Sequence, residues 1–130
     1  KGRLPEVLQR RCRFVFEENQ RVAAFMAAVV ANDRRAMREL CEGSFLGERD
    51  LYEKTVPAME RMYEAMMGAP GVVAARQSGG GFGGCMIAYV QRDRVDAFAA
   101  HVREAYRKAT DIEPVIHATA PSAGAGPLDP

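Results

Sequence analysis

The sequence has few cysteines, and their positions exclude several protein classes. Cys12, Cys41 and Cys85 are widely scattered and each lies in apolar surroundings. This spacing matches neither a zinc site nor a disulfide framework. We therefore expect no metal site, and three free, buried thiols in a reducing, cytoplasmic compartment.

An excess of one charge and long hydrophobic runs are also missing. The chain carries 18 Lys and Arg against 17 Asp and Glu, for a formal net charge of +1. Without a basic surface, a nucleic acid or an anionic membrane is not an expected partner. Charged or polar residues break every apolar run well short of a membrane span, and Lys1-Gly2-Arg3 is not a signal peptide.

Apolar residues that recur every three or four positions predict two antiparallel helices at the start of the chain. Asn32-Asp33 separates them, with Asp33 as the N-cap of the second. The residues 43–50 are interpreted as the end of this helix and a polar loop, because two glycines interrupt the pattern. One stripe runs along the first helix: Leu4, Leu8, Cys12, Val15, Val22, Met26 and Val29.

Two further helices are predicted downstream. The third starts at Thr55, with Pro57 in its first turn, and ends at Gly68 as a C′ residue. The fourth extends from Val95 to about Ala109 and leaves His101 exposed. Strands are expected at 72–75, 85–90 and 114–118. This order predicts an α+β fold, with a mainly antiparallel sheet and helices packed on one face, in a domain 1–120 followed by a flexible tail 121–130.

The most informative segment is the glycine-rich loop between the first two strands. Residues 76–85 read Arg-Gln-Ser-Gly-Gly-Gly-Phe-Gly-Gly-Cys. Glycine is used this densely where the backbone turns tightly or presses its N–H groups against a ligand. Successive N–H groups of this kind form a concave anion site, for which phosphate is the usual ligand. The alternatives are a hairpin turn and a flexible linker, but a linker would not lie between two strand-like segments.

Two known nucleotide-binding patterns do not fit the loop. Gly79, Gly81 and Gly84 satisfy GxGxxG, but a dinucleotide-binding loop leads into a helix, whereas a strand-like segment follows here. A protein-kinase loop requires a lysine on the next strand, and the next lysine is Lys108 within a helical pattern.

The segment resembles the third signature of the small-molecule kinases of the galactokinase, homoserine kinase, mevalonate kinase and phosphomevalonate kinase (GHMP) superfamily, in its galactokinase form. Shorter matches follow in the order seen in galactokinase C-terminal halves: Glu18-Asn19-Gln20-Arg21, Ser44, Arg49-Asp50-Leu51-Tyr52, Pro57 and Pro121-Ser122-Ala123-Gly124-Ala125-Gly126. The resemblance covers nearly the whole chain. Phe45 stands where His is common, and Gln77 where Met or Leu is usual, which leaves the sugar open.

The resemblance implies transfer of the ATP γ-phosphoryl group, with Mg²⁺, to the anomeric hydroxyl of galactose or a related sugar. It implies that the loop lies at the cleft between two domains, with these residues near the phosphates: Ser78, Gly79, Gly80, Gly81, Phe82, Gly83 and Gly84. Arg76 could reach a phosphate or pair with an acid. The superfamily's main ATP loop and its catalytic Asp are absent, so we expect a C-terminal part without catalytic residues, whose partner is the N-terminal half of the same enzyme.

Two other functions stay open at this stage. The whole protein could phosphorylate another sugar, such as an amino sugar, arabinose or a heptose. It could instead be a galactokinase-like regulator that senses sugar and nucleotide without turnover. The residues that would separate these possibilities belong to the missing half.

Overall fold

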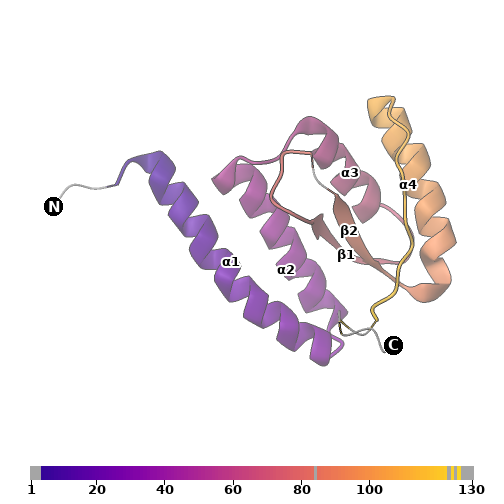
Figure 1. Ribbon diagram of the computed structural model, residues 1–130, viewed down its shortest axis with the longest axis horizontal. Helices are drawn as coiled ribbons and strands as arrows, with labels where there is room; N and C mark the ends of the chain where they lie inside the picture. The colour runs from indigo at the N-terminus through magenta and orange to yellow at the C-terminus, as the bar shows by residue number, and fades with distance from the viewer. Residues whose placement is uncertain (1–3, 84, 123, 125, 127–130) are drawn as a thin grey trace.

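The structure is a computed structural model that describes residues 4–83, 85–122, 124 and 126. Figure 1 shows helices α1 and α4 at opposite ends of the molecule, with the other elements between them. The elements in chain order are α1 (Glu6–Val30), α2 (Arg34–Gly47), η1 (Glu48–Tyr52), α3 (Pro57–Met67), β1 (Val72–Gln77), β2 (Met86–Val90), η2 (Arg92–Arg94) and α4 (Val95–Thr110).

The two strands form an antiparallel hairpin. Gln77 pairs with Met86 and Ala75 with Ala88, and the register shifts between Val72 and Ala74. The α+β class and the antiparallel pairing expected from the sequence are therefore confirmed.

Helices cover one face of this hairpin, which contributes to two hydrophobic clusters. Strand side chains alternate between faces, so Ala75 and Ala88 point to the same side. Ala75 packs with Phe45 and Tyr63, whose rings are stacked with centroids 3.8 Å apart. Ala88 also packs on the second cluster, which consists of Ala65, Ala69, Phe98, Val102 and Tyr106. The core thus lies between the hairpin and helices α3 and α4, with Phe45 supplied by α2.

The opposite face of the hairpin is partly open. Ile87 and Tyr89 belong to this face, and they are 40% and 39% exposed. Helix α1 approaches it through Phe25, whose ring centroid lies 5.6 Å from that of Tyr89, and α2 lies beside it with Leu40 and Cys41. This open face is where the groove described below is found.

The first helix packs on α2 with a different face from its apolar stripe. Phe14 and Ala28 are its buried residues, whereas Val15 and Val29, one position further on, are 50% and 46% exposed. One residue corresponds to a rotation of about 100° around an α-helix. The helix itself is confirmed, but the stripe predicted along it is largely exposed, and its Val22 and Met26 line a groove that α1 shares with α2.

The expected loop at residues 43–50 is wrong. Helix α2 continues through Gly43 to Gly47, and a π-helical turn, η1, follows directly. A Cβ at Gly47 would lie 2.8 Å from the Phe14 ring, and one at Gly43 would lie 3.1 Å from Arg21 Nε. These glycines therefore do not break the helix; they leave room for the side chains of α1.

The helix ends agree with the sequence except around α3. Asp33 caps α2, since its Oδ1 accepts a 2.9 Å hydrogen bond from the Ala36 N–H. Helix α3 begins at Pro57 after Val56, while Thr55 donates to the Glu60 carboxylate instead of starting the helix. Gly68 is the C-cap with a φ of −83°, not a left-handed C′ residue. The fourth helix agrees closely with the prediction.

The expected last strand is also wrong. Residues 114–118 pair with no strand in the part of the chain that the structure describes. Pro114 is buried and Ile116 packs on the second cluster, whereas Val115 is 82% exposed. The segment, orange to yellow in Figure 1, runs beside α4. Pro114 and Ile116 thus pack on the domain while Val115 between them is exposed, as in a strand. Among the described residues, however, this segment forms no ladder of backbone hydrogen bonds.

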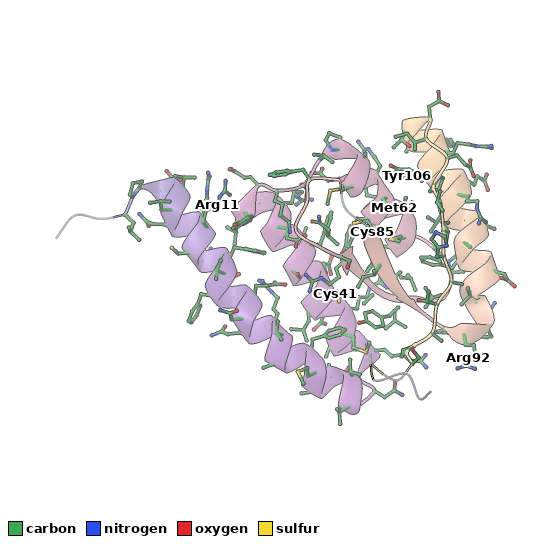
Figure 2. All side chains as sticks on the ribbon, in the orientation of Figure 1. Arg11, Cys41, Met62, Cys85, Arg92 and Tyr106 are labelled. Atoms are coloured by element: carbon green, nitrogen blue, oxygen red, sulfur yellow. The ribbon has the colours of Figure 1, made fainter. Side chains whose placement is uncertain are left out.

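All three cysteines are free, as expected, but only Cys41 is buried. Cys12 on α1 and Cys85 at the end of the glycine-rich loop (Figure 2) are exposed, so the expected burial of both is wrong. No helix among the described residues is long and apolar enough to cross a membrane. The same residues contain no cluster of three or more metal-ligating side chains.

Candidate functional site

The glycine-rich loop forms the tip of the hairpin. Its described residues are Ser78 to Gly83, and Gly84 lies outside the described residues. The Ser78 N–H donates a 2.8 Å hydrogen bond to the Cys85 carbonyl and closes the hairpin. No hydrogen bond between described residues uses the N–H groups of residues 79–83. Phe82 is 65% exposed, so even the one large side chain of the tip does not pack on the domain.

The glycines of the tip have open space around them. A Cβ added at Gly79, Gly80, Gly81 or Gly83 would meet no heavy atom within 4 Å. Of these, only Gly79 has a positive φ, of +84°. The fold of the described chain therefore explains glycine at position 79, but it supplies no steric or conformational reason for glycine at positions 80, 81 and 83.

A groove of about 370 Å³ opens beside the base of this loop, between α1, α2 and the open face of the hairpin. One part of its lining is apolar and consists of Val22, Phe25, Met26, Leu40, Ile87 and Tyr89. The other part is polar or belongs to the loop and consists of Glu18, Arg21, Ser44, Arg76, Gln77, Ser78 and Gly79, with Cys41 beside it. Burial raises the pKa of the Cys41 thiol, which makes it a poor nucleophile.

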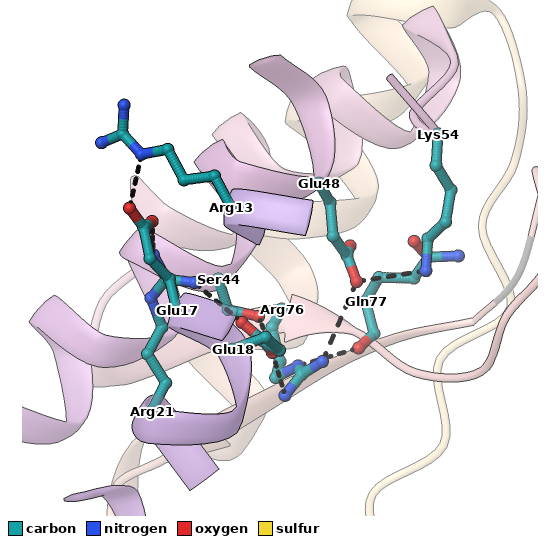
Figure 3. Close-up of polar contacts among 9 residues, drawn as sticks. All are labelled: Arg13, Glu17, Glu18, Arg21, Ser44, Glu48, Lys54, Arg76 and Gln77. Carbon is teal, nitrogen blue, oxygen red and sulfur yellow. Dashed lines mark hydrogen bonds and ion pairs between the residues drawn. The ribbon is translucent and has the colours of Figure 1, made fainter. Parts of the chain in front are cut away.

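Arg76 links the loop to two other elements through carboxylates (Figure 3). Its guanidinium lies 3.5 Å from Glu18 Oε1 on α1 and 3.9 Å from Glu48 Oε1 on η1. Ser44 donates a 2.6 Å hydrogen bond to the same Glu18 oxygen, and Arg21 pairs with the other one. Of the two roles considered for Arg76, the structure shows the pairing with acids.

Glu48 is the acid that the sequence did not reveal. It is 4% exposed, and Lys54 Nζ lies 3.2 Å from its Oε1. Its Oε2 has no hydrogen-bond partner among the described residues. Glu48 was placed in a polar loop because Gly43 and Gly47 suggested a helix end. An uninterrupted helical pattern through both glycines would have placed Glu48 on the same side as Ser44, four residues earlier.

Gln77 is a second buried polar residue and lies directly before the loop. It is 1% exposed, and its Nε2 lies 2.5 Å from the Gly81 carbonyl oxygen (Figure 3 shows its place beside Arg76). Its Oε1 has no hydrogen-bond partner among the described residues. The Arg76 Nε donates to the Gln77 backbone carbonyl at 3.1 Å, which connects both residues to the network.

The short motifs of the sequence separate into two groups. Glu18, Arg21 and Ser44 converge with Arg76 at the groove. Asp50 instead forms a surface pair with Arg49, and this hydrogen bond holds the pKa of the Asp50 carboxyl below its usual value. Tyr52 packs against Phe14 and lies outside the residues that line the groove.

The chemistry available at this site is anion binding and positioning. The acidic side chains near the loop, Glu18 and Glu48, are both engaged with cations. The backbone N–H groups of the tip are the unengaged donors. Such an arrangement can hold phosphate oxygens, while a base for proton transfer would have to come from elsewhere.

Comparisons with known proteins agree with this description. The family model described as GHMP kinases C terminal matches residues 25–108. A galactokinase of Clostridium perfringens is 36% identical over 120 residues, which cover 92% of this chain and 30% of that protein. A galactokinase of Halalkalibacterium halodurans is 32% identical over 114 residues, which cover 88% of this chain and 29% of that protein.

A solved structure shows the same similarity in three dimensions. The crystal structure of Lactococcus lactis galactokinase complexed with galactose matches with a TM-score of 0.79 and 34% identity. The match covers 85% of this chain and 28% of that one. The chain thus spans less than a third of the length of the relatives it matches.

Proposed function

Because the chain belongs to the GHMP kinase C-terminal domain family, we propose that it is the C-terminal part of an ATP-dependent sugar kinase of the galactokinase type. The reaction is transfer of the ATP γ-phosphoryl group to the anomeric hydroxyl of a monosaccharide. Catalysis of this kind depends mainly on positioning and on electrostatic stabilisation of the phosphates.

The observation that carries this proposal is the open backbone of the loop tip. Glycines 80, 81 and 83 are not required by packing or by a positive φ, and the N–H groups of residues 79–83 bind nothing among the described residues. A ligand that approaches the backbone closely accounts for both facts. In this proposal the residues at the phosphates are Ser78, Gly79, Gly80, Gly81, Phe82, Gly83 and Gly84.

The remaining parts of the reaction are assigned to the rest of the protein. When bound, Mg²⁺ neutralises phosphate charge, and the residues described here offer no cluster of side chains for it. The main ATP loop and the catalytic Asp would belong to an N-terminal half. The exposed stripe on α1, where Met26 is 66% exposed and Val22 55%, suits a surface that another part of the protein covers.

Galactose is the first candidate substrate, because the relatives are named galactokinases and one is complexed with galactose. The test is a panel of sugars with the full-length protein, ATP and Mg²⁺, in which sugar phosphate formation is measured. Turnover of galactose supports the proposal, and turnover of an amino sugar, arabinose or a heptose corrects the substrate. Binding of sugar and ATP without turnover would identify the regulator instead.

The chain of 130 residues, incubated alone with ATP, Mg²⁺ and galactose, provides the matched control. We expect it to form no sugar phosphate above background, because the catalytic Asp is assigned outside it. Robust turnover by this chain would overturn the proposal that the catalytic Asp and the main ATP loop belong to an N-terminal half.

A further inference from the structure

The buried side chain of Gln77 holds the loop in place. Gln77 Nε2 lies 2.5 Å from the Gly81 carbonyl oxygen, four residues along the chain, and thereby spans the base and the middle of the loop. Two oxygens would repel at this distance, so the NH₂ group must be the one that faces Gly81. Among the described residues, a Cβ at Gly80, Gly81 or Gly83 would meet open space, so the tip is held by this contact and by the hydrogen bond from Ser78 to Cys85 at its base.

The contact is costly for the fold itself. Gln77 lies on the covered face of the hairpin, where its strand neighbour two positions before, Ala75, is part of a hydrophobic cluster. Its Oε1 is buried without a hydrogen-bond partner among the described residues. Burial of an amide with half of its hydrogen bonds unmade is unfavourable, and an apolar side chain of similar size would avoid that cost.

The surroundings make the anchor rigid. Gln77 follows Arg76, whose guanidinium lies close to carboxylates of α1 and η1 and whose Nε donates to the Gln77 carbonyl. The Gln77 side chain holds the middle of the loop, and Arg76 holds the backbone of Gln77 against α1 and η1. The loop is thereby connected to both elements. A flexible surface side chain could not transmit such a restraint.

We propose that Gln77 is a positioning residue, which holds the loop backbone in the arrangement needed to receive phosphate. The proposal rests on the proposed function, because the restraint matters for catalysis only if the loop approaches the reacting phosphates. Gln77 itself does not touch the ligand in this proposal; it acts through the Gly81 carbonyl and the N–H groups on either side of it.

The test is Gln77→Met in the full-length protein, because Met is close to Gln in size and cannot donate to Gly81. Loss of the restraint is measured with chymotrypsin, by the rate of cleavage after the exposed Phe82, followed by mass spectrometry. We expect cleavage roughly 2- to 10-fold faster. This is the increase in the population of the released loop that follows from the loss of one hydrogen bond of ordinary net strength. The melting temperature should be equal to that of the parent protein or higher.

The kinetic measurement separates positioning from simple packing. Met is usual at this position in the family that the loop resembles, so the loop can still function with Met. We therefore expect kcat for the preferred sugar to fall only by the same roughly 2- to 10-fold as the restraint is lost. The KM for ATP should change by a smaller factor. The matched control is Gln9→Met, which removes a similar Nε2 to carbonyl hydrogen bond of 2.6 Å, to Leu4, on the exposed start of α1. It should alter neither cleavage after Phe82 nor kcat.

Two results would overturn the proposal while leaving the kinase assignment in place. One is an active parent whose Gln77→Met variant is cleaved after Phe82 at the parental rate. The other is faster cleavage with an unchanged kcat, which would show that the restraint does not serve the reaction. A parent protein without phosphotransfer to any sugar would overturn both proposals together.

Discussion

The two ends of the β1–β2 hairpin use glycine for opposite reasons. At the base, Gly71 has a φ of +76°, and a Cβ there would overlap the side chain of Arg94. Its carbonyl also accepts a 2.9 Å hydrogen bond from the Gln91 N–H, which closes the base of the hairpin. At the tip, Gly80, Gly81 and Gly83 have no positive φ, and a Cβ added to any of them would meet no heavy atom within 4 Å.

The comparison separates glycines that the fold requires from glycines that the proposed phosphate site would require. A glycine that the fold requires is recognised by the atoms that already occupy the space of its missing side chain. The tip glycines have empty space instead, which supports the proposal that a bound ligand requires them. Substitutions at the two ends should therefore separate stability from activity.

The largest effect is expected for Gly71→Ala. The new Cβ overlaps Arg94 and the backbone conformation is unfavourable for any other residue, so unfolding free energy should fall by about 3 kcal/mol or more. Thermal or denaturant unfolding of the full-length protein measures this loss. Gly80→Ala is the matched control, and a similar loss in both variants would remove the distinction between base and tip.

Gly81→Val should have the next largest effect, and on activity rather than stability. A Cβ at this position would meet no heavy atom of the described chain within 4 Å, so the melt should stay cooperative with a change below about 1 kcal/mol. Activity with the preferred sugar should fall on the order of a hundredfold, because the branched side chain blocks the approach of phosphate. Gly124→Val, which also enters open space, is the control. Parental turnover in Gly81→Val would withdraw the phosphate assignment of the loop.

Gly79→Ala should lower the unfolding free energy by less than Gly71→Ala does, and activity by less than Gly81→Val does. Its φ of +84° makes a Cβ unfavourable by roughly 1 to 2 kcal/mol, although no atom lies in the way. Unfolding experiments on the full-length protein should therefore place it between Gly71→Ala and Gly81→Val. A loss as large as that of Gly71→Ala would mean that the tip packs against the protein after all.

The smallest effect on stability is expected for Phe82→Ala. The ring is 65% exposed, and surface substitutions of this kind change unfolding free energy by less than about 0.5 kcal/mol. The measurement is again the unfolding curve of the full-length protein. A clearly larger loss would show that another part of the protein covers the ring, and the tip would then resemble the base.

The sequence predicted most helices and both paired strands because their signals are local. Asp33 caps α2 through its own side chain, and the repeats of apolar residues in α4 lie within one helix. The extent of α2 was not predictable in this way. Gly43 and Gly47 look like helix breakers alone, and only the side chains of Arg21 and Phe14, which occupy the space beside them, show why glycine is there.

The candidate site was predicted in outline but not in its connections. The density of glycine in residues 79–83 reveals the loop from sequence, since no other residue provides such an accessible backbone. The roles of Glu48 and Gln77 depend on contacts with residues distant in the chain or across the loop. Neither position has a local pattern that distinguishes a buried, engaged polar group from a surface one, and both were overlooked for this reason.

The segment of residues 114–118 has a consequence for how order is measured in this protein. Pro114 is buried and Ile116 half-buried, while Val115 and His117 are exposed, yet the backbone forms no ladder within the described part of the chain. Amide protons that lack hydrogen-bond partners exchange rapidly with solvent even where neighbouring side chains are packed. The amides of this segment should therefore take up deuterium as fast as those of an unstructured tail. The methyl groups of Ile116, in contrast, should show restricted motion in NMR relaxation experiments. In this protein, slow amides and immobile side chains identify different parts of the chain.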